Sequence, residues 1–364
     1  MTVNVGVDLH KTQFTVCVLQ KRGNEFEKYP TEESGYKQFL QRVKRWQGAG
    51  KEVRVAVEST GNTRYFKNRM EAAGIGVVVI NTLKFKVVNE SVKKTDKHDA
   101  ATIAEFLEKD MLPESKLCSE TSEQLRRLLK VRTTLVRTGV TVKNQIHALL
   151  TGLGMKDTKA SLQSKRGRQR VLDALKEREN GLVVQPLFDT IEQLEKSVKQ
   201  IEDELEKLTC GDRMVELLQT IPGCGKISAW TIRAHTDDIK RFASSKKYAA
   251  YAGLVPWVQN SNETVHHGKI TKRGPEELRT ALVQVVMGIR RSKKTTAKWR
   301  LMQRYEMMKQ NKGSGKSIIA AARKLATIIW HMLSKDEEFD SALMLDRDLI
   351  KKASSMRLAE LAGK

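Results

Sequence analysis

Four short apolar runs near the start of the chain constrain its fold more than any other feature. They read VNVGVDL (3–9), FTVCVLQ (14–20), VRVAVEST (53–60) and GVVVIN (76–81). The first two runs are close enough to predict a hairpin. Helical patterns near 34–47 and over 63–73 come before and after the third run, and a further helix is expected over 97–109. Strands that alternate with helices after an opening hairpin predict an α/β domain with a mixed sheet.

Acidic residues end two of these strands. Asp8 ends the first strand and Glu58 the third. Ligands of α/β sheets collect at strand ends, so these two carboxylates are expected to meet. Asp96 and Asp99, in KKTDKHDA (93–100), share one face if the segment is helical, because residues three apart are neighbours on a helix. Four converging acids repel one another unless a cation lies between them. Mg²⁺, which takes oxygen ligands, is the predicted cofactor, with Mn²⁺ as a substitute. Two such ions about 4 Å apart can clamp a phosphodiester.

Each acid also has a plainer interpretation. Asp96 would cap a helix, and Asp99 would favour the positive first turn of the same helix. Glu58 would cap a turn or pair with a lysine. The order of a strand-end aspartate, a strand-end glutamate and a helical DxxD is more informative than any single member, and it favours a metal site.

The chain is strongly basic, with 66 Lys and Arg against 43 Asp and Glu and a formal charge of +23. Such a surplus attracts polyanions, so nucleic acid is the first partner to consider. Basic residues beside the acids and in SKRGRQR (164–170), interpreted as a linker or loop, are expected to bind nucleic-acid backbones: Lys93, Lys94, Lys97, Arg166, Arg168 and Arg170. RRSKKTTAKWR (290–300) is a second candidate run. The alternative for both runs is a solvated surface.

The middle of the chain predicts long helices. LRRLLKVRTTLVRTGVTVKNQIHALL, within 121–150, is read as one helix with an apolar stripe. Further on, apolar residues follow steps of three and four and predict a heptad seam: Ile191, Leu194, Val198, Ile201, Leu205 and Leu208. This seam belongs either to an intramolecular hairpin with the 121–150 helix or to a dimerising coiled coil, and the pattern leaves both open.

A third unit begins near Arg213. TIPGCGKISAWTI (220–232) has the form of a helix-hairpin-helix. Its Gly223 and Gly225 would let backbone N–H groups approach a phosphate, and Lys226 would add charge. The alternative is a plain turn between packed helices, and Trp230 is expected in the core. Helices are expected again over 275–290, 295–309 and 316–334, after a long loop, GLVPWVQNSNETVHHGKITKRG. GSGKS (313–317) lacks the full phosphate-loop pattern and is read as a helix start.

Two classes of protein are disfavoured. No apolar run approaches the roughly 18 residues of a membrane span, and the start lacks the form of a signal peptide, so we expect a cytoplasmic protein without a membrane partner. The four cysteines form no CxxC pair, which disfavours a zinc site or a disulfide framework. Reduced cysteines in the core are expected.

Four segments together resemble a known family. VGVDLHK, AVESTG, KTDKHDA and AGLVPWVQNSNETVHHGKITKRGPEELR are similar to segments of the DEDD-type transposases of bacterial insertion sequences that also carry an essential serine. The resemblance spans roughly residues 3–110 and 214–290. It implies a RuvC-like (RNase H-like) N-terminal domain whose catalytic, metal-binding acids are Asp8, Glu58, Asp96 and Asp99. It also implies a nucleophilic serine in the C-terminal domain, and a structured, element-encoded guide RNA that pairs with donor and target DNA in the bacterial nucleoid.

The family pattern selects one serine. Ser261, in WVQNSNE, is followed at the expected spacing by Gly268, Ile270, Lys272 and Gly274, whereas Asn262 stands where the family usually has glycine. A serine hydroxyl needs activation by a base or a metal. His266 or His267 would handle protons. Three basic residues would stabilise phosphate charge: Lys269, Lys272 and Arg273.

The resemblance and the residues together give one expected organisation. It comprises a RuvC-like DEDD domain (1–112), a helical, coiled-coil middle region (113–212), a mostly α-helical transposase domain with the helix-hairpin-helix and the serine (213–345), and a charged tail (346–364). The expected activity is a transposase or recombinase in which Ser261 attacks DNA and forms a phosphoserine link. Because strand exchange needs several active sites, a homodimer or homotetramer joined through the middle helices is expected. The alternatives are a metal-dependent RuvC-like nuclease that uses water, as a junction resolvase does, and a binding scaffold with an inactive site.

Overall fold

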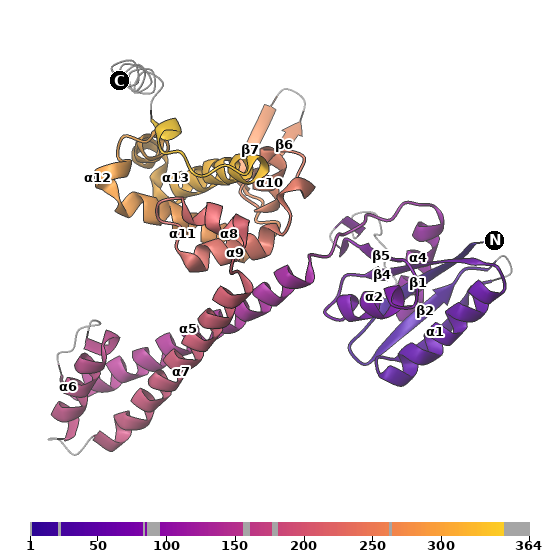
Figure 1. The fold of residues 1–364 in the computed structure, drawn as a ribbon, viewed down its shortest axis with the longest axis horizontal. Coiled ribbons are helices and arrows are strands. Elements are labelled where there is room, and N and C mark those ends of the chain that lie inside the picture. The colour runs from indigo at the N-terminus through magenta and orange to yellow at the C-terminus, as the bar shows by residue number, and fades with distance from the viewer. Residues whose placement is uncertain are drawn as a thin grey trace. The chain divides into compact units, whose positions relative to one another are not determined.

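The chain divides into two compact units. The computed structural model describes residues 2–20, 23–82, 84–85, 95–155, 161–176, 181–261 and 264–345. The units comprise Met1–Cys118 and Ser119–Lys364 (Figure 1). The expected charged tail, 346–364, lies outside the described residues. No described helix combines the length and the apolar character that crossing a membrane requires.

The first unit is built on a five-stranded mixed sheet. Its strands are β1 (Thr2–Leu9), β2 (Gln13–Val18), β3 (Glu25–Pro30), β4 (Glu52–Glu58) and β5 (Val77–Ile80), in the spatial order β3-β2-β1-β4-β5. β1, β2 and β3 are antiparallel, whereas β4 runs parallel to β1 and to β5. The predicted mixed sheet is confirmed. β3 was not predicted, because its sequence, EFEKYP, carries three charges and resembles a loop.

Side chains of β1 and β4 alternate between two faces of the sheet. Val5, Val7, Val55 and Val57 lie on one face, in a core shared with aromatic residues from α1 (Glu33–Gly48) and α2 (Thr63–Glu71). Gly6 and Ala56, on the other face, lie against α4 (Asp96–Glu108). The predicted helices at 34–47, 63–73 and 97–109 therefore exist, and the two faces of the sheet have different neighbours.

Gly6 allows α4 to lie directly on β1. A Cβ added at Gly6 would lie 2.1 Å from the backbone oxygen of Ala100 and 2.5 Å from the backbone nitrogen of Ala104. Since both are backbone atoms of a helix, they cannot move aside without shifting the helix itself. The contact therefore fixes where the first turn of α4 lies relative to the end of β1.

We expect Gly6→Ala to lower the free energy of unfolding by about 1–3 kcal/mol, the usual range for overpacking a core. Thermal unfolding of the full chain measures this change. The matched control is Gly76→Ala, because a Cβ at exposed Gly76 meets nothing within 4 Å. That change should stay within about 0.5 kcal/mol. Equal melting temperatures for the two variants would show that close contact between Gly6 and the backbone of α4 does not contribute to stability.

The second unit begins with a long helical hairpin. α5 (Glu120–Gly152) and α7 (Gly181–Leu208) run side by side, with α6 (Lys165–Lys176) near one end (Figure 1). Arg132 pairs with Glu202 at 2.7 Å and Lys143 with Glu195 at 3.4 Å, so the two helices are antiparallel. The heptad seam of α7 therefore packs within the chain. The prediction of a linker at 164–170 was wrong, since most of this segment forms the start of α6.

The rest of the second unit is mostly helical. Its helices are α8 (Arg213–Gln219), α9 (Lys226–Thr236), α10 (Ser245–Tyr251), α11 (Glu276–Arg291), α12 (Lys293–Thr296) and α13 (Arg300–Lys335). α13 is interrupted at Gly313, whose φ is 77°, so a new helical segment starts at GSGKS as predicted. Trp230 is buried in the core of this region, again as predicted. All four cysteines are free, with Cys17 and Cys224 buried and Cys210 exposed.

A two-stranded antiparallel hairpin replaces much of the long loop that was expected before α11. It consists of β6 (Pro256–Ser261) and β7 (Thr264–Ile270). Aromatic and β-branched residues favour strands, and the segment has them in PWV and TVH, but its many polar residues resemble a loop. The loop prediction was therefore wrong for these two segments.

Candidate active site

Asp8 lies under the first turn of α4. It shares a sheet face with Gly6, two residues earlier on β1, and is 5% exposed. Two residues span about 6.6 Å along a strand, and the four residues from Ala100 back to Asp96 span about 6 Å along a helix. Since Ala100 lies on Gly6, the helix brings Asp96 to Asp8. The start of α4 is capped by Thr95, whose side-chain oxygen accepts from the backbone N–H of His98 at 3.2 Å.

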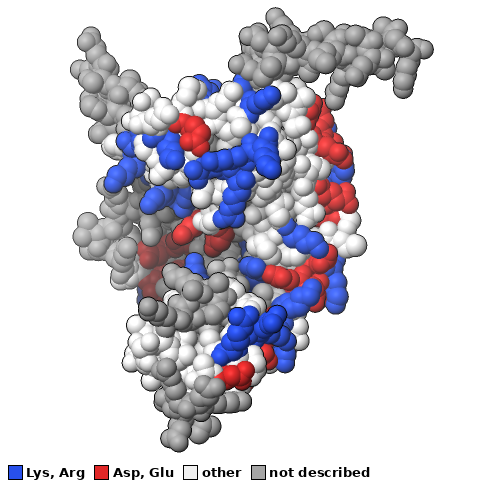
Figure 2. Space-filling view, turned by 90° about the vertical axis from the view of Figure 1, so that its left-hand side faces the viewer, with Lys and Arg blue, Asp and Glu red and all other residues white. Residues whose placement is uncertain are grey.

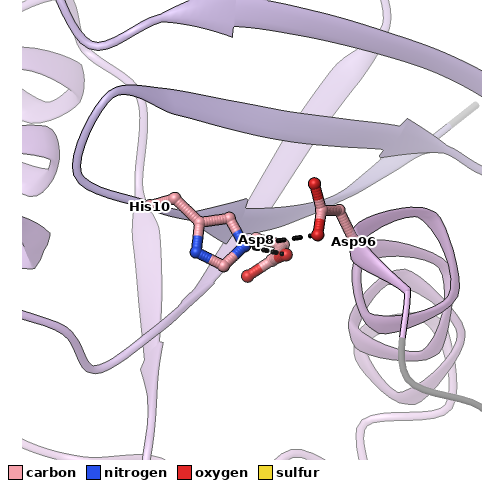
Figure 3. Close-up of side chains that lie close together, drawn as sticks. All are labelled: Asp8, His10 and Asp96. Carbon is pink, nitrogen blue, oxygen red and sulfur yellow. Dashed lines mark hydrogen bonds and ion pairs between the residues drawn. The ribbon is translucent and has the colours of Figure 1, made fainter.

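Three side chains converge at this point (Figure 3). His10 Nε2 lies 2.9 Å from Asp8 Oδ2 and 3.5 Å from Asp96 Oδ1. One potential ligand atom from each of the three residues lies within 4.8 Å of the others. Lys28 of β3 approaches from the other side, with its Nζ 3.4 Å from Asp96 Oδ2. The cluster thus joins β1, the residue after its end, β3 and the start of α4.

The two carboxyl groups have opposite electrostatic environments. Burial raises the pKa of Asp8, and the charges of Asp99 and Asp96 raise it further, although His10 opposes them through its charge and hydrogen bond. Desolvation also acts to raise the pKa of Asp96. There, however, the hydrogen bond from Lys28 and the charges of His10 and Lys28 outweigh it, so the pKa is lowered. The buried acid is therefore the costly one to ionise.

The other two predicted acids belong to the same region. The charge of Asp99 contributes to the raised pKa of Asp8, which places Asp99 within electrostatic reach. Glu58, half-buried, ends β4 directly after Val57, and Val57 pairs with Val7 across the parallel strands. Asp8 and Glu58 are thus neighbours at the ends of adjacent strands, on the face that α4 covers. The topology brings the four acids to one end of one face.

This arrangement fits a divalent cation. Carboxylate oxygens suit Mg²⁺ and Mn²⁺. Burial, and after it the charges of Asp99 and Asp96, raise the pKa of Asp8, and the positive charge of a bound cation would favour the ionised carboxylate. A cation here would be held by Asp8 and Asp96, with His10 as a further donor. His10 was not predicted, although the D-x-H spacing in DLHK was a usable signal. Lys28 could not be found from the sequence, because it lies on the unpredicted strand β3.

The predicted serine ends the first strand of the hairpin in the second unit. Ser261 is the last residue of β6, and its backbone pairs with Thr264 of β7. Outside what the structure describes lie Asn262 and the side chains of Ser261, His266 and His267. The family spacing selected Ser261, and the structure puts it at the end of one of two paired strands.

Close backbone contacts with residues 251–255 fix the position of the base of this hairpin. Gly274 has a φ of 100°, and a Cβ there would lie 1.9 Å from the backbone oxygen of Tyr251. The Thr271 N–H donates to Val255 O at 2.9 Å and the Lys272 N–H to Gly253 O at 3.3 Å. Glycine at 274 is therefore required by space and by conformation, and the KITKRG segment has a defined path next to the hairpin.

Comparison with known proteins finds two family models that match different parts of the chain. A family model described as transposase, of the DEDD type of IS110 elements, matches residues 5–155. A second model, described as the transposase IS116/IS110/IS902 family, matches residues 215–301, which include the hairpin. The two matches together span more than half of the chain. The chain belongs to this transposase family.

Individual relatives are similar in sequence to this transposase over most of its length. A "Probable family 20 transposase" of Pseudomonas aeruginosa is 27% identical over 296 residues, which are 78% of this chain and 84% of the relative. The transposase for insertion sequence element IS1111A of Coxiella burnetii is 27% identical over 348 residues, covering 92% of this chain and 90% of the relative. A pilin gene-inverting protein of Moraxella bovis is 24% identical over 349 residues, covering 93% and 98%.

The basic residues predicted to contact nucleic acid differ in their surroundings. Figure 2 shows lysine and arginine side chains gathered in the upper part of one face, where α12 lies, and again near its lower end, where α6 lies. Arg166 and Arg170 of α6 are exposed. Arg168 is buried and donates to both Glu195 carboxylate oxygens, at 2.7 and 2.8 Å. Its guanidinium therefore joins α6 to α7 and is not exposed to a nucleic acid, unlike its two neighbours.

Two further groups of basic residues were predicted to contact nucleic acid, one near the acids of the transposase and one after Ser261. Lys97, on α4, lies over the ring of Phe26, with its Nζ 5.7 Å from the ring centroid. Lys93 and Lys94 lie outside the described residues. Lys269, Lys272 and Arg273 follow Ser261 on β7 and in the segment after it, and all three are exposed.

The predicted helix-hairpin-helix of the transposase lies between α8 and α9. Gly223 has a φ of 83° and touches the backbone of Gly288 on α11, where a Cβ on Gly223 would lie 2.6 Å from the Gly288 carbonyl carbon. Gly225 precedes the first residue of α9. Lys226 donates to Glu206 at 2.5 Å. A phosphate at this turn would therefore have to displace a carboxylate from Lys226.

Proposed function

We propose that this transposase cuts and rejoins DNA strands through Ser261, with divalent cations held by Asp8, Glu58, Asp96 and Asp99. The observation that carries the proposal is the convergence of Asp8 and Asp96, from separate elements, in a cluster whose ligand atoms lie within 4.8 Å of one another. The order of strands and the DEDD pattern also support a RuvC-like identity for the first unit. Mg²⁺ is the proposed ion, since carboxylates with open water positions suit it best.

The chemistry follows from a serine and a set of acids. The Ser261 hydroxyl attacks the scissile phosphorus, so that a P–Oγ bond forms while the bond to the 3′ oxygen breaks. His266 or His267 accepts the serine proton. The freed 3′ hydroxyl of another strand then attacks the phosphoserine, which rejoins DNA and restores the serine. A bound divalent cation supplies positive charge to the phosphodiester, and the acids hold it there.

Basic side chains would hold the nucleic acids. Lys269, Lys272 and Arg273 are proposed to neutralise phosphate charge next to Ser261. Arg166 and Arg170 are proposed backbone contacts on the surface of α6. The turn with Gly223, Gly225 and Lys226 would position a duplex without reading its sequence. Because base pairing can supply specificity that such contacts lack, a structured RNA encoded by the element is the proposed guide to donor and target DNA.

Assembly of several subunits is also proposed. Strand exchange needs more than one active site, and α5 carries apolar side chains on its surface: Val131 is 47% exposed and Val140 is 53% exposed. A homodimer or homotetramer joined through α5 and α7 would cover them. We also propose that the chain divides functionally into a DEDD domain (1–112), a helical middle region (113–212), a serine-bearing domain (213–345) and a charged tail (346–364). The pilin gene-inverting relative, by its name, supports recombination as the class of reaction.

A covalent adduct tests the proposal. DNA that carries the element's ends, incubated with the full-length protein, Mg²⁺ and any adjoining non-coding RNA, should yield a protein–DNA adduct that survives denaturation. EDTA should abolish the adduct and Mn²⁺ should restore it, because the four acids need a cation to act together. Adduct formation at the full rate in EDTA would contradict the role given to the acids.

A plain metal-dependent nuclease is the second candidate. It is favoured by the position of all four acids in the first unit, where a metal site needs no residue from the serine-bearing unit. In that case water attacks and the products are cut strands with no attached protein. Cleavage without any adduct would support the nuclease and overturn the serine mechanism.

A further inference from the structure

An open groove in the second unit has no role in the chemistry described above. It has a volume of about 1420 Å³ and lies between the base of the hairpin, both segments of α13 and the chain after α13. Sites for small ligands measure about 300–1,000 Å³, so the groove is large for a metabolite. Pro256 of β6 and Gly268 of β7 contribute to its wall, which makes it continuous with the base of the hairpin whose first strand ends at Ser261.

The groove is strongly basic and most of its positive charge is uncompensated. Six of the cationic side chains that line it form no ion pair or hydrogen bond among the residues that the structure describes: Lys269, Lys272, Arg304, Lys316, Arg323 and Lys324. The acids that line the groove belong to one short segment, 337–340, after the end of α13. Six unpaired cations around one concave surface repel one another, and a polyanion would relieve that repulsion.

The floor of the groove is apolar. Leu254, Ile270, Ile319, Ile328 and Met332 line it. Three rings are also present: His331, which is exposed, Phe339, which is half-buried, and Tyr305, which is buried. A duplex presents phosphates and sugars and would leave such a floor uncovered. A single strand places phosphates on basic rims and bases on apolar or aromatic surfaces.

We propose that this groove binds a single DNA strand and leads it to the β6–β7 hairpin. The inference rests on the proposed function, because it is the role of Ser261 that makes DNA the expected polymer. The strand attached to Ser261, or awaiting attack, lies with its phosphates against α13 and its bases on the apolar floor. The groove thus separates one strand from its partner at the base of the hairpin whose first strand ends at Ser261.

A pair of charge reversals on α13 tests the groove. The full-length protein, in a Ser261→Ala background that prevents cleavage, is titrated into a labelled single strand of about 16 nucleotides, the upper end of site sizes for such grooves. The variant is Arg323→Glu with Lys324→Glu. Its matched control is Lys246→Glu with Lys247→Glu on α10, an exposed pair outside the groove that changes the net charge equally.

We expect the α13 variant to bind the single strand at least ten-fold more weakly than the control. The slope of log affinity against log salt should be shallower by about 1.4, since each phosphate contact to a single strand contributes about 0.7. His331→Ala should weaken single-strand binding about five-fold by removing a stacking surface, and should leave duplex binding unchanged. This exposed substitution keeps the test valid if the double variant does not fold, which the melting temperatures of the variants report.

Three results would overturn the proposal. They are equal losses in the α13 and α10 variants, equal losses of duplex and single-strand binding, and tighter binding of RNA than of DNA of the same sequence. Covalent adduct formation, measured with Ser261 restored, separates this inference from the proposed function. If the adduct forms and the groove variants bind the single strand as tightly as the control, the groove proposal alone is refuted. If the groove variants lose single-strand binding as expected but protein with Ser261 forms no adduct, the serine mechanism alone is refuted.

Discussion

Asp8→Asn is expected to abolish DNA cleavage and strand transfer while leaving the protein folded. The substitution removes a negative charge from the centre of the acidic cluster without changing the size of the side chain. Metal ions contribute several kcal/mol of transition-state charge stabilisation, which corresponds to a loss of about a thousand-fold in rate. Binding of Mn²⁺, followed by titration calorimetry or by electron paramagnetic resonance, should weaken in parallel.

The stability of the same variant gives an independent measure. Because burial and neighbouring acids raise the folded-state pKa of Asp8, ionising it costs free energy that the unfolded chain does not incur. That cost is absent below the ordinary carboxyl pKa. It grows as the pH rises from the ordinary pKa to the raised one, and it is fully present above the raised value. Asparagine cannot ionise, so at neutral pH and without metal the variant should melt no lower than the wild type, and the advantage should disappear in acid.

A matched acid controls for general charge effects. Asp110 belongs to the same unit, and its side chain is 74% exposed. Asp110→Asn changes the net charge by the same amount outside the cluster, so it should leave metal binding and cleavage close to wild type. An active Asp8→Asn variant, or one that binds Mn²⁺ as tightly as Asp110→Asn does, would remove Asp8 from the metal site.

Ser261→Ala is expected to lose the covalent adduct completely and strand transfer by about ten-thousand-fold or more, the scale of nucleophile deletions in serine hydrolases. Metal binding should be unchanged, because the acids lie in the first unit. The result is read from denaturing gels of labelled DNA, with adduct and free cut strands measured separately.

Ser292→Ala is the control for this serine. Ser292 is exposed, lies between α11 and α12 outside the hairpin, and makes no capping hydrogen bond through its side chain. Its removal should leave adduct formation intact. If Ser261→Ala still cleaves DNA at the wild-type rate and neither protein gives an adduct, water is the nucleophile and the nuclease interpretation holds.

Most of the elements that build the candidate site could be predicted from the sequence. Alternating apolar residues in VNVGVDL and VRVAVE predict half-buried strands whatever surrounds them, so both strand-end acids were found. The DxxD spacing predicts two acids on one helix face for the same local reason. The interruption of α13 at Gly313 followed from glycine and serine chemistry in GSGKS.

Other features depend on contacts between segments far apart in the sequence. Lys28 joins the acids because β1 pairs with β2 and β2 with β3. Arg168 and Arg170 are two residues apart in one basic run. Only the packing of α6 on α7 buries the first and leaves the second exposed.

The sequence alone determined the mixed α/β start, the heptad seam, the acidic residue set and the basic character of this transposase, because each depends on residue type and spacing along the chain. Only the tertiary structure decided that the seam packs within the chain, that the loop after α10 contains a hairpin, and that α13 and the hairpin enclose a basic groove. Burial and charge compensation are properties of neighbours in space. They therefore appear only once long-range packing has chosen which side chains meet.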